Sequence, residues 1–277
     1  MPVARWETIV KNGVQVWYLP AWGQVGVLGA FTARRGGVSP PPWDTLNLGL
    51  HVGDEPKRVR HNREIAGMAL GLPAANWVSA RQVHGSQVKL VGVEDKGRGA
   101  LDDATVVGEY DALMTAAPGV PLAMYFADCV PLFFLDPLKP AIAVAHAGWR
   151  GTLAGVATTT LAAMGRAFGT DPTRVLVAIG PSIGPCCYEV GPEVVERVKE
   201  VFADPEPLVW RGNRCYLDLW TANRLLLTGA GVPPENVVAA EVCTSCHPHE
   251  FFSHRASGGT TGRMAALLCI VGGRISP

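Results

Sequence analysis

The sequence has no excess of charge of either sign, because 24 lysines and arginines balance 24 aspartates and glutamates over 277 residues. Without such an excess, we expect neither nucleic acid nor an anionic membrane as a partner. No window approaches the roughly 18 consecutive apolar residues of a membrane span, and the opening stretch MPVARWETIV has no apolar segment typical of an export signal. We therefore expect a soluble, cytoplasmic protein.

The chain also lacks the dense, even-numbered cysteine pattern of a disulfide-stapled protein, since it has seven cysteines in 277 residues. A core of this size needs no disulfide framework, so we expect reduced thiols, some buried and some available as ligands or nucleophiles. We interpret the adjacent Cys186 and Cys187 as buried loop packing, because a disulfide between neighbouring residues is strained.

No low-complexity linker or internal repeat divides the chain, and short apolar runs alternate with helical patterns along it. We therefore predict one α/β domain with a mixed sheet, spanning residues 1–277. The stretch 120–136 is long enough for two strands, with a break expected at Pro131. The predicted strands cover residues 14–20, 24–33, 120–136, 140–146 and 174–180.

Helix signals are equally local. Asp54 and Gly71 predict the two ends of one helix, and Thr152, Pro192 and Asp218 predict the starts of three others. One face of the first helix carries basic side chains, which we expect to be solvated because charges on an amphipathic helix normally face water. These are Arg58, Arg60, His61 and Arg63.

Three stretches place a metal-capable side chain between an apolar run and a glycine or proline. They are RQVHGSQV around His84, FADCVP around Cys129 and AVAHAGWRG around His146. Such a set suits zinc or copper and leaves a fourth position for water or substrate. The spacings, 129−84 = 45 and 146−129 = 17, match no local metal motif. Taken singly, Cys129 also fits plain core packing, and each histidine fits a satisfied polar group at a strand end.

The stretch AHAGWRGT, residues 145–152, sets a guanidinium before a predicted helix. The free N–H groups and the dipole of a helix start favour an anion, so Arg150, with Gly151 and Thr152, predicts a phosphate site. The alternative is an arginine that holds a loop carbonyl.

The segment CTSCHPHEFFSHRASGGTTGRM, residues 243–264, allows three interpretations. Cys243, Cys246 and His247 spell the C-x-x-C-H pattern of haem attachment, and with His249 and His254 they could form a structural zinc knuckle. We favour an active-site loop that packs two aromatic side chains and directs two basic ones to the site: Phe251, Phe252, Arg255 and Arg263.

Seven motifs in order resemble those of one family: TLNLGLHVGDEPKRVRHNRE, RQVHGSQV, YDALMT, ADCVPLFFLDP, AVAHAGWRGT, IGPSIGPCCYEVG and FFSHRASGGTTGRMAAL. It is the YfiH/PgeF-like family, long labelled multicopper polyphenol oxidoreductase or laccase-domain proteins, and the resemblance covers about residues 26–270. It implies a single-domain layered α/β sandwich with central mixed β-sheets and outer helices. It also implies a zinc ion held by His84, Cys129 and His146, with copper as the other candidate.

For function, the resemblance implies phosphorolysis of adenosine, inosine and methylthioadenosine to the free base and (methylthio)ribose 1-phosphate. Adenosine deamination and a role in editing peptidoglycan precursors are also associated with the family. Copper-dependent polyphenol oxidation fits poorly, because a multicopper cluster needs many histidines and the chain has seven, spread along its length. One departure from the family pattern is Ala256, where a second arginine is usual. The expected partners are a purine nucleoside and phosphate, with monomer and homodimer both open.

These inferences assign roles to particular residues. Arg150 would hold the phosphate that attacks C1′ of the ribose, while Trp149 packs or walls the pocket. In deamination, a water activated by the metal would attack C6 of adenine, with Asp128 as proton carrier, or instead as a cap or support for a ligand. Further candidates for binding phosphate or substrate are Asn47, Gln82, Arg255 and Arg263.

Two functions of other classes remain open at this point. Cys129 as nucleophile and His146 as base would make a metal-free cysteine hydrolase or deamidase. A purine-binding protein without catalysis is the other alternative.

Overall fold

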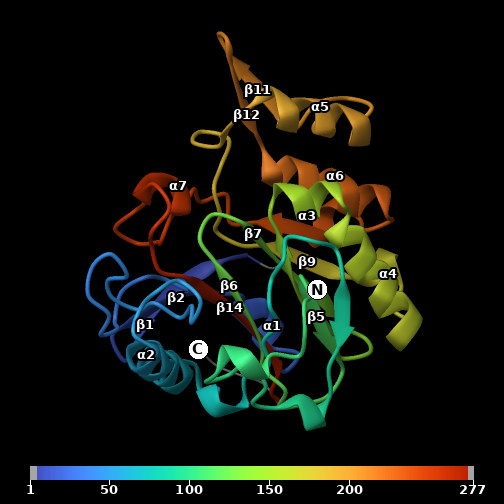
Figure 1. The fold of residues 1–277 in the computed structure, drawn as a ribbon. Helices are drawn as coiled ribbons and strands as arrows, with labels where there is room; N and C mark the ends of the chain where they lie inside the picture. Colours follow the sequence, from blue (N-terminus) through green and yellow to red (C-terminus); the bar gives the residue numbers. More distant parts are fainter. Residues whose placement is uncertain (1–4, 274–277) are drawn as a thin grey trace.

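The structure, a computed structural model, describes residues 5–273 and stacks two β-sheets face to face (Figure 1). All strands of the first sheet are antiparallel, in the order β1 (Glu7–Lys11), β2 (Val14–Tyr18), β3 (Val27–Thr32), β14 (Met264–Ile270) and β6 (Leu122–Phe126). The second sheet is mixed, in the order β13 (Val237–Ala239), β9 (Leu176–Ile179), β7 (Val130–Asp136), β8 (Ala141–Ala147), β5 (Ala112–Thr115) and β4 (Val88–Leu90).

Helices cover the outer faces of both sheets. Helix α2 (Pro56–Leu70) packs on the first sheet, and α4 (Val156–Phe168) and α6 (Leu219–Gly229) pack on the second. A small sheet of β10 (Glu189–Val190), β12 (Arg214–Leu217) and β11 (Leu208–Arg211) projects with α5 (Pro192–Val201) at the top of Figure 1. The remaining helices are short: α1 (Pro20–Gly23), α3 (Trp149–Leu153) and α7 (His254–Ser257). The predicted layered α/β sandwich with mixed sheets and outer helices is confirmed.

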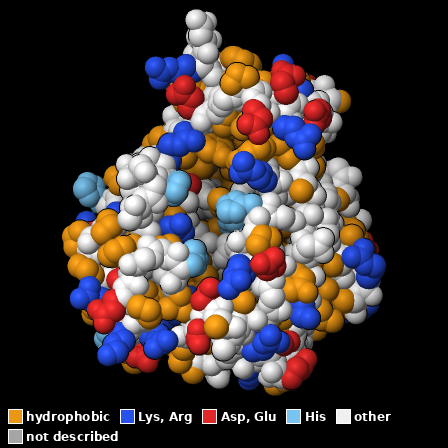
Figure 2. Space-filling view, in the orientation of Figure 1, with side chains coloured by type: hydrophobic (Ala, Val, Ile, Leu, Met, Phe, Trp, Pro, Cys, Tyr) orange, Lys and Arg blue, Asp and Glu red, His pale blue; other side chains and the backbone are white. Residues whose placement is uncertain are grey.

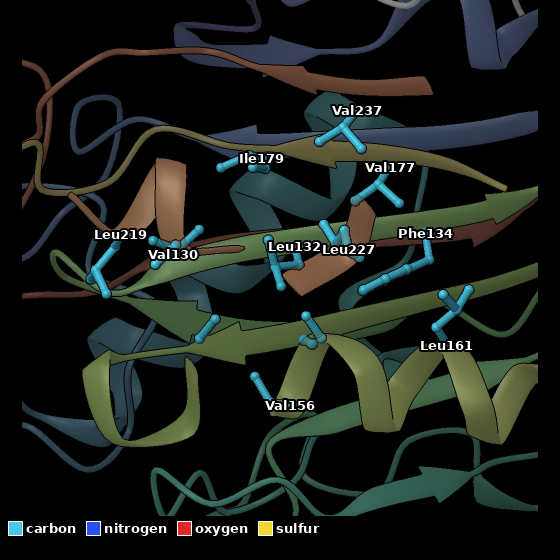
Figure 3. Packing of buried hydrophobic residues seen from close by; sticks show 14 of the residues in the cluster. Val130, Leu132, Phe134, Val156, Leu161, Val177, Ile179, Leu219, Leu227 and Val237 are labelled. Atoms are coloured by element: carbon cyan, nitrogen blue, oxygen red, sulfur yellow. The ribbon is translucent and has the colours of Figure 1, made fainter. Parts of the chain in front are cut away.

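The core follows the two-residue period of the buried strands. Figure 3 shows Leu132 and Phe134 of β7 on the side of α4, whose Val156 and Leu161 belong to the same cluster. Phe133, between them, packs into the second cluster, which fills the space between the two sheets. Because successive side chains of a strand point to opposite faces and both faces of β7 are covered, its first six residues are apolar and all seven are buried. The seventh is Asp136, whose carboxylate accepts backbone N–H groups of the turn that follows.

The predicted strands are present, but the break in the 120–136 stretch lies elsewhere than expected. The chain leaves β6 after Phe126 and enters β7 at Val130, so the interruption is at Ala127–Cys129 and not at Pro131. Asp128 turns the backbone with a φ of +89°, whereas Pro131 lies near the beginning of β7, where proline is tolerated.

The helix ends agree with the local signals in three of five places. Gly71 ends α2 in the left-handed conformation, Pro192 begins α5, and the Asp218 side chain accepts the N–H groups that begin α6. The N-cap position of α2 is Glu55 and not Asp54, and the Glu55 side chain makes no capping hydrogen bond. The buried Asp54 carboxylate instead accepts hydrogen bonds from Ser39 and Asn47 of the preceding loop. Within residues 5–273, no helix has the length and apolarity that a membrane crossing requires.

Arg63 of α2 is not solvated as predicted but is 1% exposed. Its guanidinium donates to the carbonyls of Leu48, Gly99 and Ala100 at 2.6–2.9 Å and lies 4.3 Å from the ring centre of Tyr125. A helical pattern could not reveal this, because the acceptors belong to loops distant in sequence. One buried cation therefore ties two loops to α2.

Replacing Arg63 with methionine should leave these buried carbonyls without donors, at about 1–3 kcal/mol for each unsatisfied group. We expect Arg63→Met to lower the free energy of unfolding by about 3 kcal/mol or more. Arg58→Met is the matched control, because Arg58 lies on the same helix in an exposed pair with Glu55 and should cost about 1 kcal/mol or less. Urea unfolding of both variants measures the difference, and equal stability would contradict the structural role of Arg63.

Candidate active site

Three segments distant in sequence bring His84, Cys129 and His146 together. The register pairs Val130 of β7 with Ala147 of β8, so the residues just before these two, Cys129 and His146, lie at the same end of the sheet. His84 comes from the loop that precedes β4. Its Nε2 atom lies 3.9 Å from the Cys129 Sγ atom, and its ring centre lies 4.8 Å from that of His146.

The donor atoms of these three residues all lie within 4.8 Å of one another. In a tetrahedral zinc site, bond lengths of about 2.3 Å to sulfur and about 2.0–2.1 Å to nitrogen separate those atoms by about 3.6 Å. The separation between His84 and Cys129 is close to that value. The donor set of two imidazoles and one thiolate suits zinc, so the residues present fit a metal.

A buried carboxylate that sequence reasoning missed organises this cluster. Asp111 immediately precedes β5, is fully buried, and accepts a hydrogen bond of 2.8 Å from Nδ1 of His146. The same carboxylate accepts the backbone N–H groups of Val83, His84 and Gly85 at 2.6–3.2 Å. With Nδ1 engaged, Nε2 of His146 is left for a ligand. The only sequence signal was the motif YDALMT, in which this aspartate looks like an ordinary strand-end residue.

Charges inside the cluster favour the thiolate form of Cys129 and the protonated form of His146, so a metal ion bound at Nε2 of His146 would displace a proton. Burial alone raises the pKa of the Cys129 thiol, but the charge of His146 and hydrogen bonds from His146 and His84 lower it to about 6. Burial lowers the pKa of His146, but Cys129 and then Asp111 raise it to about 9. Cys129 is thus a thiolate near neutral pH, which is the form needed by a metal ligand or a nucleophile.

Two residues of the site hold a backbone conformation that is unfavourable for non-glycine residues. His84 has a φ of 60° and Asp128 a φ of 89°. The Asp128 carboxylate accepts a hydrogen bond of 2.7 Å from the Thr244 hydroxyl and another of 2.7 Å from the backbone N–H of Arg255. Asp128 therefore ties the break between β6 and β7 to the C-terminal loop, while also lining the cavity described next.

The three candidate ligands open into a cavity of about 580 Å³, a volume in the range of small-molecule sites. Figure 2 shows this face hollowed between α7 and α3, with histidine and basic side chains around the hollow. Desolvation and the charge of Arg263 lower the pKa of His51 to about 4, so this histidine is neutral at pH 7. The basic side chains that line the cavity are Arg81, Arg150, Arg255 and Arg263.

Arg150 reaches the cavity from a helix that differs from the predicted one. The short α3 begins at Trp149 and ends at Leu153, and α4 starts only at Val156 after the left-handed Gly155. Arg150 therefore lies inside a short helix and does not precede a long one. Its guanidinium lies 4.4 Å from the Trp149 ring centre, and within residues 5–273 it pairs with no acidic side chain.

Gly151 and Thr152, predicted with Arg150 as phosphate ligands, do not line the cavity. Thr152 is fully buried, and its hydroxyl donates to the Ala147 carbonyl at 3.4 Å and accepts from the Asn223 amide at 3.2 Å. A Cβ atom at position 151 would lie 3.0 Å from the carbonyl oxygen of Gly85. Gly151 thus allows the close packing of α3 against the loop that carries His84, whereas Thr152 joins α3 to β8 and α6.

Of the two predicted amide contacts with substrate, Gln82 and Asn47, only the first lines the cavity. Gln82 lines the cavity, and its amide both donates to and accepts from the backbone of Tyr125 at 2.8 Å. Asn47 is fully buried outside the cavity lining, and its Oδ1 atom accepts the backbone N–H of Arg263 at 2.9 Å. Asn47 therefore positions the segment that presents Arg263.

The C-terminal loop, residues 243–264, forms part of the cavity wall. Phe251 and Phe252 are fully buried, whereas Arg255 and Arg263 face the cavity. Arg255 lies over Tyr188, with 5.1 Å between the guanidinium carbon and the ring centre.

Comparison with known proteins agrees with this architecture. The family model described as multi-copper polyphenol oxidoreductase laccase matches residues 29–271. The purine nucleoside phosphorylase YlmD of Geobacillus stearothermophilus is 44% identical over 88% of this chain and 90% of its own length. The adenosine deaminase RL5, from an unknown prokaryotic organism, is 35% identical over 84% of this chain and 90% of its own length.

A solved structure shows the same fold. The crystal structure of the hypothetical protein YfiH of Bacillus licheniformis is 34% identical and superposes with a TM-score of 0.90, covering 98% of this chain and all of that one. The layered sheets, the clustered His84, Cys129 and His146, and the motif order thus agree with one assignment. The chain belongs to the multi-copper polyphenol oxidoreductase laccase family, the YfiH-like family that its motifs resemble.

Proposed function

We propose that this chain is a cytoplasmic, zinc-dependent purine nucleoside phosphorylase that also deaminates adenosine. The observation that carries the proposal is a cluster of two histidines and one cysteine at the base of a cavity lined by four arginines. Relatives named purine nucleoside phosphorylase and adenosine deaminase support the class of substrate. Adenosine, inosine and methylthioadenosine are the proposed nucleosides.

The cavity provides both kinds of surface that such a substrate pair needs. Trp149, Tyr188 and Leu219 offer aromatic and apolar contacts for a purine, while the arginines offer charge-assisted hydrogen bonds to phosphate. Of the four arginines, Arg81 is partly compensated by Asp103 at 3.5 Å, and Arg255 and Arg263 donate to backbone carbonyls. Arg150 is therefore the arginine most available to phosphate.

The proposed ligands His84, Cys129 and His146 would hold a zinc ion, which would supply Lewis acidity at the base of the cavity. In phosphorolysis, a phosphate oxygen held by Arg150 forms the new bond to C1′ while the bond from C1′ to the purine nitrogen breaks. Asp128 has both carboxylate oxygens engaged by Thr244 and Arg255, so we assign it to positioning the loop that carries Arg255.

A metal-free cysteine hydrolase is the second candidate, because Cys129, His146 and Asp111 stand in the order of a nucleophile, a base and a carboxylate that orients the base. The low pKa of Cys129 suits that reaction as well as it suits metal binding. Metal dependence separates the two candidates.

Product analysis of adenosine with and without phosphate tests the proposal. With phosphate we expect adenine and ribose 1-phosphate, and in both conditions inosine. Cys129→Ala should abolish all three products and lose one equivalent of zinc per chain, because a ligand is missing. Cys269→Ala is the matched control, since Cys269 is a buried cysteine of β14 outside the cavity. Phosphate-independent conversion of adenosine by zinc-free protein, without ribose 1-phosphate and with inactivation by iodoacetamide, would instead favour the cysteine hydrolase.

Arg150→Ala tests the phosphate site. Loss of a hydrogen bond between charged groups costs about 1.5–3 kcal/mol, and each 1.4 kcal/mol is about tenfold. Phosphorolysis at low phosphate should therefore fall about ten- to a hundredfold, whereas deamination, which consumes water, should change much less. Arg150→Lys should recover part of the phosphorolysis because it keeps the charge. Parallel loss of ribose 1-phosphate and inosine would show that Arg150 is structural.

Asp111→Asn tests the carboxylate beneath the cluster. The substitution removes the charge that orients His146 and directs an amide toward backbone N–H donors, so zinc affinity should fall about ten- to a hundredfold. Competition with a chelator measures the affinity. Asp136→Asn is the control, because Asp136 is a buried aspartate that accepts backbone N–H groups beyond the far end of β7. An Asp111→Asn protein with parental zinc affinity would exclude the assigned role.

A further inference from the structure

We propose that Cys186, Cys187, Cys243 and Cys246 form a second metal site, a structural zinc tetrathiolate that joins two loops of the cavity wall. Cys186 and Cys187 lie in the loop between β9 and β10, and Cys243 and Cys246 lie in the loop that follows β13. The Sγ atoms of Cys186 and Cys187 each lie 3.4 Å from that of Cys246. All four sulfur atoms lie within 4.8 Å of one another.

This arrangement suits one tetrahedral ion. With zinc–sulfur bonds of about 2.3 Å, the edges of a tetrahedron of four sulfurs are about 3.8 Å, which lies between the shortest separations here and the 4.8 Å limit. Cys243 and Cys246 have the two-residue spacing of a zinc knuckle. The pair Cys186 and Cys187 supplies the other two ligands, which the sequence pattern alone did not connect to the knuckle.

The surroundings also suit a thiolate cluster. The Cys243 Sγ atom accepts the backbone N–H of Gly184 at 3.3 Å, a hydrogen bond that stabilises negative charge on sulfur. Binding of Zn²⁺ by four thiols releases four protons and leaves a dianion. Two guanidinium groups lie beside it, because Arg211 donates to the Cys186 carbonyl at 3.3 Å and Arg255 to the Cys187 carbonyl at 3.1 Å.

The convergence of the four sulfur atoms differs from what buried loop packing, a single disulfide or a knuckle that includes His247 would give. Cys186 is exposed and not buried loop packing as predicted, and its thiol converges with that of Cys246. Two cysteines stand equally close to Cys246, so the geometry selects no single disulfide partner. The knuckle histidine predicted beside Cys246 is not among the converging groups, since His247 Nδ1 is engaged with the Cys243 carbonyl at 2.8 Å.

The site would position two walls of the cavity. Tyr188, which lines the cavity, directly follows Cys187. Thr244, between Cys243 and Cys246, donates to the Asp128 carboxylate. A zinc ion bound to all four sulfurs would hold these loops in register without touching the substrate. The proposal rests on the four thiols alone and does not depend on the reaction carried out in the cavity.

Metal counting in variants tests the second site separately from the first. The parent protein should contain two equivalents of zinc per chain, Cys129→Ala should keep one, and Cys129→Ala combined with Cys246→Ser should contain none. Cys246→Ser alone should keep one equivalent. Because Cys246 is exposed, this variant should fold, and Cys186→Ser provides a second exposed position. Cys215→Ser, a buried cysteine of β12 outside both clusters, should keep two equivalents.

Cobalt substitution of the Cys129→Ala protein identifies the ligands, since a tetrahedral tetrathiolate Co²⁺ site has intense visible absorption that Cys246→Ser should remove. If the Cys129→Ala protein is found to contain no bound metal, the proposal is wrong. A mass lowered by the two hydrogens of a disulfide, or bound iron in place of zinc, would also overturn it. If instead the second site persists while adenosine is not converted with or without phosphate, the proposed function fails and this proposal stands.

Discussion

The buried carboxylate of Asp111 is the interaction on which the candidate active site depends. It accepts one imidazole N–H and three backbone N–H groups, and so joins the end of β8 to the loop that carries His84. A fully buried charge is tolerated only when its hydrogen-bonding capacity is satisfied. The four N–H donors satisfy the hydrogen-bonding capacity of the Asp111 carboxylate. Because the carboxylate binds Nδ1 of His146, the Nε2 atom is the nitrogen that faces the cavity.

The position of the site follows from how the second sheet ends. Adjacent antiparallel strands bring the start of β7 and the end of β8 to one edge, and β5 brings Asp111 to the same edge. Side chains at the ends of these strands lie next to loops and not in the apolar core. A cluster of polar groups can therefore form there without placing polar residues in the middle of the strands. The left-handed turn at Asp128 lets the chain pass from the first sheet to the second at this edge.

The two cysteine-containing clusters differ in what they can do. The first combines two imidazoles with one thiolate and opens into the cavity, as a site for chemistry must. The second has four sulfurs and no further ligand position, which is typical of a structural site. The loops that supply the second cluster also supply Tyr188 and Arg255 to the cavity, so the two are linked through the cavity wall.

Local sequence determined the elements and the chemical types of the site residues. Apolar runs predict the buried strands, and Gly71, Pro192 and Asp218 predict helix ends, because these signals act within a few residues. The strand-end pattern indicated His84, Cys129 and His146 as ligands, and the family resemblance indicated the same three residues. Tertiary structure decided the rest, because strand register and loop crossings bring together residues that no local window contains. These decisions include the burial of Arg63, the role of Asp111, and the meeting of Cys186 and Cys187 with Cys243 and Cys246.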